Sequence, residues 1–175
     1  LAKTSAASAS TAFAGYGAMR GIDGTYGSEN YGWVGTNANG TGDWLLLDLG
    51  RRAPVGRIKY DTRFGPQYLT SIWQESFDIS VSEDGLNWRT VVSRRQETSA
   101  QLFDFRIPIQ AVRYVKVHNI LSKYTADPNW HYAYVNEIEL YTDIQPPPEV
   151  SLLSPSLTNN ASLSQLSFQV NGVQE

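Results

Sequence analysis

The chain of 175 residues contains no cysteine. A disulfide framework, a thiolate metal site and a cysteine nucleophile are therefore all excluded. Histidine is almost as scarce, because the two histidines are His118 and His131, and this disfavours a zinc site built from several imidazoles. The sequence also lacks a nucleophile-elbow motif, a phosphate-cradling glycine loop and a zinc-ligand pattern.

Charge is sparse, and long apolar runs are absent. The chain has 14 basic and 17 acidic residues, a formal net charge of −3, and both signs are spread along it. Nucleic-acid binding needs basic clusters that displace counterions from phosphates, so a nucleic-acid partner is disfavoured. With 41% hydrophobic residues and no apolar run near the ~18–20 residues that cross a bilayer, the sequence predicts a soluble protein.

The first residues, Leu1 to Gly21, are rich in Ala, Ser, Thr and Gly. They lack the basic start and the apolar core of a signal peptide. We expect that any export signal has been removed or lies upstream.

Short strand-like runs separated by turn residues make up most of the chain. Phe77, Ile79 and Val81 alternate with polar residues, as one buried and one wet face would require. Asp84-Gly85 lies between two runs and supplies the positive φ values of a tight hairpin. No helix of useful length is predicted, so the pattern favours an all-β sandwich. The predicted runs are Trp44–Leu49, Val55–Arg63, Ser76–Ser82, Trp88–Ser93, Leu102–Ile107, Val112–His118 and Tyr134–Tyr141.

The composition changes near residue 144. Three consecutive prolines in Gln145–Glu149 cannot join a sheet ladder and favour an extended linker. We predict one domain over residues 1–143, a Pro-rich linker over 144–149, and a partial module over 150–175. The last segment carries the strand-like run Leu166–Val170 but is too short to bury a stable core alone. We interpret it as the start of a neighbouring immunoglobulin-like module, so the parent protein is predicted to be modular.

Five short patterns occur in one order along residues 1–143. They are Ala18–Gly24 followed by Trp33, then Gly42–Gly50, Ser82–Trp88, Arg113–Val117 and Asn136–Tyr141. Together they resemble the discoidin or coagulation-factor C-type domain family, whose bacterial branch comprises the family 32 carbohydrate-binding modules. The resemblance implies an eight-stranded jelly-roll β-sandwich of the galactose-binding-domain type, with ligands bound in loops at one end.

Two departures from the animal domains favour the bacterial branch. The animal domains usually carry a disulfide that joins the ends of the domain, and this chain has no cysteine. Their membrane-binding apolar spikes are rimmed by basic residues, and no such cluster occurs in this sequence. The resemblance therefore implies a sugar-binding module that is secreted or lies at the cell surface, and it disfavours a membrane partner.

The resemblance also implies a structural calcium ion in the loop around Asp23. Calcium takes roughly 6–8 oxygen ligands, from carboxylates and from backbone carbonyls. A plain turn at Asp23-Gly24 is the alternative, and the stretch Thr25–Tyr31 is longer than the family's usual spacing. The implied ligands are the carbonyl of Arg20, the side chain of Asp23, the carbonyl of Thr25, an oxygen of Ser28, the carbonyl of Ala133 and the side chain of Glu137.

The ligand face is predicted from two loops. Tyr60–Arg63 resembles the family pattern that ends in a sugar-contacting arginine, whereas Val34 stands where the family's galactose binders have histidine, and Tyr68 and Leu69 stand near its asparagine. Loop aromatics can stack on a sugar ring, or they can simply close the end of the barrel. The resemblance instead matches Trp33, Trp44 and Trp88 to framework positions, which implies a core role. The predicted ligand-binding residues are Arg63, Tyr68, Trp73, Tyr124, Asn129, Trp130 and His131.

The predicted function is that of a non-catalytic carbohydrate-binding module that targets an attached secreted enzyme or adhesin to a glycan or polysaccharide. An adhesion domain that binds protein or phospholipid, and a structural spacer without a ligand, remain alternatives. Asp61, Glu75 and Asp127 near the two loops could select an amino sugar or be solvated. Asp61 and Glu75 could form a glycosidase pair at ~5–10 Å, but the resemblance is to a non-catalytic domain.

Overall fold

The computed structural model describes residues 6–27, 31–38, 42–142, 150–151 and 169–170. The chain divides into two compact units, Leu1–Asp143 and Ile144–Glu175. In the second unit, β9 (Val150–Ser151) pairs antiparallel with β10 (Gln169–Val170). The predicted linker and, apart from these two strands, the predicted immunoglobulin-like fragment lie outside the described residues.

The first unit is built of strands joined by loops and two short 3₁₀ helices, η2 (Ala18–Ile22) and η3 (Pro66–Tyr68), which confirms the all-β prediction. None of the helices in the described ranges is long and apolar enough to span a membrane. The strands are β1 (Ala6–Ala9), β2 (Trp33–Val34), β3 (Leu45–Asp61), β4 (Ile72–Ser82), β5 (Arg89–Arg94), β6 (Leu102–Tyr124), β7 (Tyr134–Val135) and β8 (Glu137–Tyr141).

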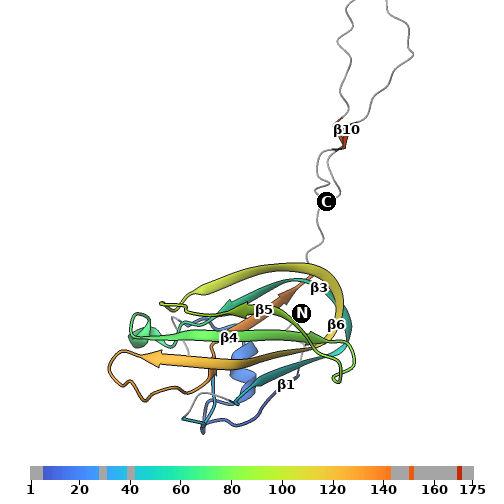
Figure 1. Ribbon diagram of the computed structural model, residues 1–175. Coiled ribbons are helices and arrows are strands. Elements are labelled where there is room, and N and C mark those ends of the chain that lie inside the picture. Colours follow the sequence, from blue (N-terminus) through green and yellow to red (C-terminus); the bar gives the residue numbers. More distant parts are fainter. Residues whose placement is uncertain (1–5, 28–30, 39–41, 143–149, 152–168, 171–175) are drawn as a thin grey trace, which may run out of the picture. The chain divides into compact units, whose positions relative to one another are not determined.

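The two long strands each take part in both layers of the sandwich. The beginning of β3 pairs with β1 and with the end of β6, and β6 pairs in turn with β4, which pairs with β5. After a register shift between Asp48 and Ala53, the rest of β3 pairs with the beginning of β6 and with β8. Figure 1 shows the yellow ribbon of β6 curving round one side of the unit as it passes between the layers. This is the arrangement of the expected jelly-roll sandwich.

The core lies between the two layers. Phe77, Ile79 and Val81 point into it with 0%, 0% and 3% exposure, as their alternation predicts. The polar residues between them are also buried, which the alternation does not predict. Asp78 accepts hydrogen bonds from Ser93, Arg95 and Asn119, and Ser80 exchanges hydrogen bonds with Thr90 and His118. A hydrogen-bonded layer therefore covers this face of the sheet.

The three tryptophans assigned to the core differ in exposure. Trp33 is fully buried and Trp44 is half-buried, but Trp88 is 37% exposed, so its assignment to the core is wrong. The Lys116 ammonium lies 5.4 Å from the ring centroid of Trp44 and 5.7 Å from that of Trp88. Trp88 thus packs against a cation on the outer face of the sheet, where the indole stays partly in water.

Candidate functional site

A cavity of about 500 Å³ opens among loops of the first unit. The loops precede β2, join β3 to β4, and join β6 to β7. The last two loops meet because β4 begins beside the end of β6, with Ile72 opposite Tyr124, at the same side of the unit in Figure 1. The first joins them because β2 pairs with β7, with Val34 opposite Tyr134. The lining comprises Ala14, Val34, Gln67, Ile72 and eight aromatic residues, here called the aromatic cup: Phe13, Tyr16, Tyr31, Phe64, Tyr68, Tyr124, Trp130 and Tyr132.

The rings of the aromatic cup contact one another in a continuous series. Neighbouring centroids are 5.2–6.4 Å apart, and most pairs meet edge to face, the geometry that the ring quadrupoles favour. Phe64, which is 8% exposed, contacts Tyr31, Tyr68 and Trp130 and rests on the buried ring of Tyr134. The rings thus enclose a hollow rather than a flat platform. The series runs Phe13, Tyr132, Trp130, Tyr124, Tyr68, Tyr31, Tyr16.

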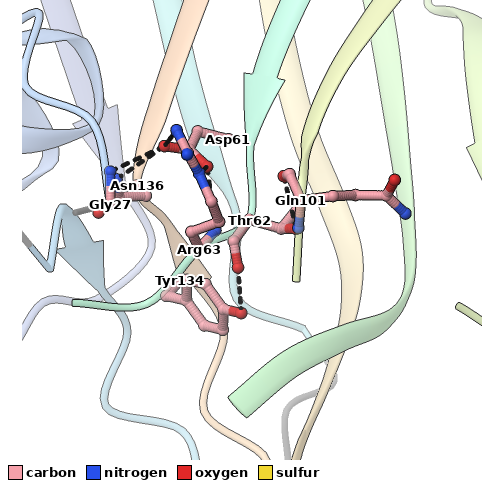
Figure 2. Close-up of polar contacts among 7 residues, drawn as sticks. All are labelled: Gly27, Asp61, Thr62, Arg63, Gln101, Tyr134 and Asn136. Carbon is pink, nitrogen blue, oxygen red and sulfur yellow. Dashed lines mark hydrogen bonds and ion pairs between the residues drawn. The ribbon is translucent and has the colours of Figure 1, made fainter. Parts of the chain in front are cut away.

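Tyr134 beneath the cup is held by polar contacts. Its hydroxyl donates to the carbonyl of Thr62 at 2.7 Å, and its own carbonyl accepts from the side chain of Gln74. Burial raises the pKa of Tyr134 well above its usual value, so this phenol stays protonated and remains a donor. Thr62 is tied in turn to Gln101 by hydrogen bonds of its amide and its hydroxyl, as Figure 2 shows. The floor of the cavity is therefore anchored to β3 and to the segment before β6.

Asp61 is the fully buried centre of a polar hub next to the cup (Figure 2). Its carboxylate accepts from the amide of Gly27 at 2.8 Å, the side chain of Asn136 at 3.2 Å, and the amide and guanidinium of Arg63 at 2.8–3.1 Å. The hydrogen bond to Asp61 raises the pKa of Arg63 above its usual value. The hub joins the loop before β2, the end of β3 and the start of β8.

Arg63, expected to contact ligand, therefore directs its Nε and a terminal nitrogen at Asp61 and is absent from the cavity lining. Gly27 packs against it so closely that a Cβ atom there would lie 2.1 Å from the Arg63 carbonyl oxygen. The ion pair with Asp61 thus holds Arg63 at the start of the loop that carries Phe64 and Tyr68.

The other expected ligand residues separate into two groups. Tyr68, Tyr124 and Trp130 line the cavity. Three others, Trp73, Asn129 and His131, are not among the lining residues.

The contacts of these three lie within the scaffold. Trp73 pairs with Lys123 across β4 and β6, the amide of Asn129 donates to Asp127 in a turn, and the His131 ring shares a hydrogen bond with the carbonyl of Ser122. They shape the strand ends and the loop that carry the cup.

The acidic groups near the loops do not form a carboxylate pair. Asp61 is bound to Arg63, and Glu75 forms an ion pair of 3.4 Å with Lys123. Asp127 is exposed, and one of its carboxylate oxygens accepts the amide of Asn129. Asp61 and Glu75, which were considered as a glycosidase pair, are thus each paired with a different basic side chain.

Sequence reasoning missed much of the cup. Phe13, Tyr16, Tyr31, Phe64 and Tyr132 line the cavity but were not among the expected ligand residues. The available signal for Phe13 and Tyr16 was the presence of single aromatic residues in a stretch otherwise rich in Gly, Ala and Thr, where no strand needs them.

Two of the residues expected to bind calcium, Asp23 and Glu137, lie near each other at a second place. The amide of Gly24 donates to Glu137 at 2.8 Å across 113 positions of sequence, and the amide of Thr25 donates to Asp23. Glu137 is 2% exposed. Burial, opposed by the Gly24 hydrogen bond and reinforced by the negative charges of Asp23, Glu139 and Asp61, raises the pKa of Glu137 to about 8.

The carboxylates of Asp23 and Glu137 are oxygen ligands of the kind that a hard cation takes. A buried carboxylate that is destabilised by neighbouring carboxylates gains from a bound divalent ion. Within the described part of the chain, no group of three or more His, Cys, Asp or Glu side chains is placed so that it could hold a metal ion together, so the remaining ligands would have to be carbonyls. The carbonyl of Ala133 already accepts the amide of Gly35 at 2.8 Å, and Ser28 lies outside the described residues.

Another hollow, of about 390 Å³, lies at the hairpin between β4 and β5 and has a different chemistry. Arg52, Glu83, Asp84 and Arg89 are among its lining residues, and Arg52 pairs with Glu83 at 3.2 Å. Charged side chains therefore line this hollow, whereas the described lining of the aromatic cup contains no charged side chain.

Comparison with known proteins assigns the family. The sequence model of the F5/8 type C domain matches residues 5–138. No curated protein matches the chain.

Solved structures share the fold. Chitosan-binding module 1 of a chitosanase/glucanase from Paenibacillus sp. IK-5 is 25% identical, with 79% of this chain and 95% of that chain covered and a TM-score of 0.57. The family 32 carbohydrate-binding module of Clostridium perfringens NanJ, solved with galactose, is 16% identical, with 79% and 94% covered and a TM-score of 0.61. The family 32 module of AlyQ, solved with 4,5-unsaturated mannuronic acid, is 20% identical, with 78% and 93% covered and a TM-score of 0.58. The chain belongs to the F5/8 type C domain family.

Proposed function

We propose that the chain is a non-catalytic carbohydrate-binding module whose aromatic cup holds the sugar. The observation that carries the proposal is the cavity of about 500 Å³, lined by eight aromatic side chains that come from three loops. Its volume lies in the range of ~300–1,000 Å³ that is usual for ligand pockets. Family membership and the sugar-binding structural neighbours support the same function.

The chemistry of the cup suits a sugar. A pyranose has an apolar face of C–H groups, which packs on aromatic rings, and an equator of hydroxyls, which need donors and acceptors. Trp130 contacts Phe64, Tyr124 and Tyr132 and offers the largest ring. The phenol hydroxyls of the five cup tyrosines and the amide of Gln67 can serve the sugar hydroxyls.

We also propose that the module holds a structural calcium ion. The carboxylates of Asp23 and Glu137, with carbonyls of Arg20, Thr25 and Ala133 and an oxygen of Ser28, would be its ligands. When bound, the ion neutralises the carboxylates and joins the end of η2 to the start of β8. Two observations support this proposal. The amide of Gly24, which follows Asp23, donates a hydrogen bond to Glu137, and Glu137 is buried.

The biological role that we propose is targeting. A single shallow sugar site binds weakly, and attachment to an enzyme or adhesin raises the effective concentration at a polysaccharide or cell surface. We therefore propose a secreted or cell-surface parent protein with further modules. One of the similar structures is a chitosan-binding module derived from a chitosanase/glucanase, which supports attachment to an enzyme.

A glycan array with calcium present tests the function. The unmodified chain should bind a limited set of glycans, and the variants Trp130→Ala and Tyr68→Ala should lose that binding. Trp88→Ala is the matched control, because Trp88 lies outside the cup and is 37% exposed. Thermal unfolding of each variant shows that the fold persists. Binding to no glycan, or binding that survives Trp130→Ala, would contradict the proposal.

One observation favours a second candidate, binding to phospholipid. Phe13 is 40% exposed and Met19 is 54% exposed, and Arg20 is exposed beside Met19. Apolar side chains next to a cation can enter a lipid surface. Sedimentation with phosphatidylserine vesicles, compared between the parent chain and Met19→Ser, distinguishes this function from sugar binding.

A further inference from the structure

The aromatic cup has no charged group in its described lining. The polar side-chain groups of its lining residues are neutral: the phenol hydroxyls of Tyr16, Tyr31, Tyr68, Tyr124 and Tyr132, the Gln67 amide and the Trp130 indole nitrogen. The other lining residues have aromatic or aliphatic side chains. A ligand in the cavity would therefore meet uncharged hydrogen-bonding groups and ring faces.

The charged groups around the cup are engaged elsewhere. Asp61 and Arg63 form the hub and neutralise each other, and Glu75 pairs with Lys123. Arg20 approaches the cup, with its Cζ atom 5.7 Å from the ring centroid of Tyr16, but it does not line the cavity. None of these contacts directs a carboxylate or a guanidinium into the space that a ligand would fill.

The absence of charge in this lining should distinguish uncharged sugars from amino sugars and uronic acids. Moving an ammonium or a carboxylate from water into an apolar cavity is costly unless a group of opposite charge meets it there. A hydroxyl loses less, because a phenol or an amide can both donate to it and accept from it. The lining therefore favours uncharged sugars over amino sugars and uronic acids.

We propose, on the basis of the sugar-binding function above, that the aromatic cup selects uncharged saccharides and rejects both cationic and anionic ones. This separates the chain from two of its structural neighbours. One is described as binding chitosan, a polymer of amino sugars, and the other was solved with an unsaturated mannuronic acid. The chain shares the fold of these modules, but the chemistry of its cavity differs from what their ligands require.

The test compares pairs of related glycans, one uncharged and one charged. We would titrate the chain at pH 5.5 and low salt with triacetylchitotriose and chitotriose, and with methyl galactoside and its 6-carboxylate. An array supplies further uncharged, amino and uronate glycans. We expect all binding that Trp130→Ala abolishes to be to uncharged glycans. Their charged counterparts should bind at least tenfold more weakly, which corresponds to about 1.4 kcal/mol.

The results separate the two proposals. A charged glycan that binds as tightly as its uncharged counterpart, and that Trp130→Ala releases, would overturn the selectivity while leaving the sugar-binding function intact. Binding to no glycan, or binding that is unaffected by Trp130→Ala, would overturn the function and the selectivity with it.

A designed change of preference makes the test sharper. Gln67→Glu places one carboxylate in the cavity lining without changing the size of the side chain. Binding of chitotriose should rise about threefold at low salt, the gain expected of one exposed ion pair, and the gain should vanish at high salt. Gln110→Glu is the matched control, because Gln110 lines the charged hollow at the β4–β5 hairpin. A Gln67→Glu chain that folds and whose affinity for chitotriose does not rise relative to its affinity for triacetylchitotriose would contradict the inference.

Discussion

Replacing Asp61 by alanine should destabilise the first unit more than any change to a surface ion pair. The carboxylate is 0% exposed and accepts hydrogen bonds from Gly27, Arg63 and Asn136, so its loss leaves buried donors unpaired. Breaking a buried ion pair by removing one partner costs about 3–5 kcal/mol. The Arg63 side chain is 30% exposed, so water solvates part of the freed guanidinium. We therefore expect a loss of about 2–4 kcal/mol in the free energy of unfolding.

Thermal unfolding and urea titration measure this loss. For a domain of this size, each kcal/mol corresponds to roughly 3–5 °C, so the melting temperature should fall by about 10 °C. Glu83→Gln is the control, because Glu83 and Arg52 form an ion pair with side chains 51% and 63% exposed. Exposed pairs of this kind contribute about 0–1 kcal/mol, so the control should unfold almost like the parent chain.

A double-mutant cycle with Arg63→Met tests whether the two residues act as a pair. The combined variant should be less destabilised than the sum of the single variants, because the second change removes a cation that has already lost its partner. If Asp61→Ala costs less than about 1 kcal/mol, or if the two losses add, the hub does not hold the loop as described. Sugar binding should weaken together with stability, because the hub positions Phe64 and Tyr68.

Three further predictions concern calcium, acid stability and one glycine. Calcium should raise the melting temperature of the parent chain and EDTA should lower it, whereas Glu137→Gln should remove the response; an equal response in both chains would contradict the calcium site. Burial opposes ionisation of Asp78, but hydrogen bonds from Arg95 and its neighbours outweigh the effect of burial and lower the pKa of Asp78 to about 2. This carboxylate therefore stabilises the fold above pH ~4 and loses that effect as the pH falls towards 2. Asp78→Asn should be less stable than the parent by about 1–2 kcal/mol at pH 6, and the difference should shrink at pH 2, as melting curves over this range would show. Gly65 has φ of +62°, and a Cβ atom there would lie 2.2 Å from Cε1 of Tyr31. Gly65→Ala should therefore displace this ring, and the loss in the free energy of sugar binding should be at least as large as the loss in the free energy of unfolding. Unchanged sugar affinity in a folded Gly65→Ala chain would show that the position of Tyr31 does not matter.

The strands could be predicted because they follow from local rules. The inward residues Phe77, Ile79 and Val81 alternate at the period of a strand, and Gly85 adopts the positive φ of 78° that the hairpin needs. Burial of Asp78 and Ser80 could not be predicted in this way. It depends on hydrogen bonds from β5 and β6, whose side chains reach this face only after the strands have paired.

The same distinction explains the outcome at the candidate site. Trp130 and Tyr68 could be predicted at this site, because large aromatic rings in polar loops either stack on a ligand or close the end of the barrel. The ion pair between Arg63 and Asp61 could not be predicted, because only the packing of Gly27 and Asn136 around Asp61 buries that carboxylate. An arginine that could contact a sugar thus became the partner of a buried carboxylate.

The sequence by itself determined the all-β class, the strand pattern and the family of this protein, because alternation, turn residues and short motifs act over a few positions each. The tertiary structure decided which residues make the cavity and what charge it carries. Phe13, Tyr31 and Trp130 lie far apart in the chain, and tertiary pairing brings them to one cup. The pairing of β4 with β6 brings together the loop before β4 and the loop after β6, and the pairing of β2 with β7 adds the segment before β2. The absence of charge from the described lining is likewise a tertiary property, since it arises from ion pairs that form only when the chain is folded.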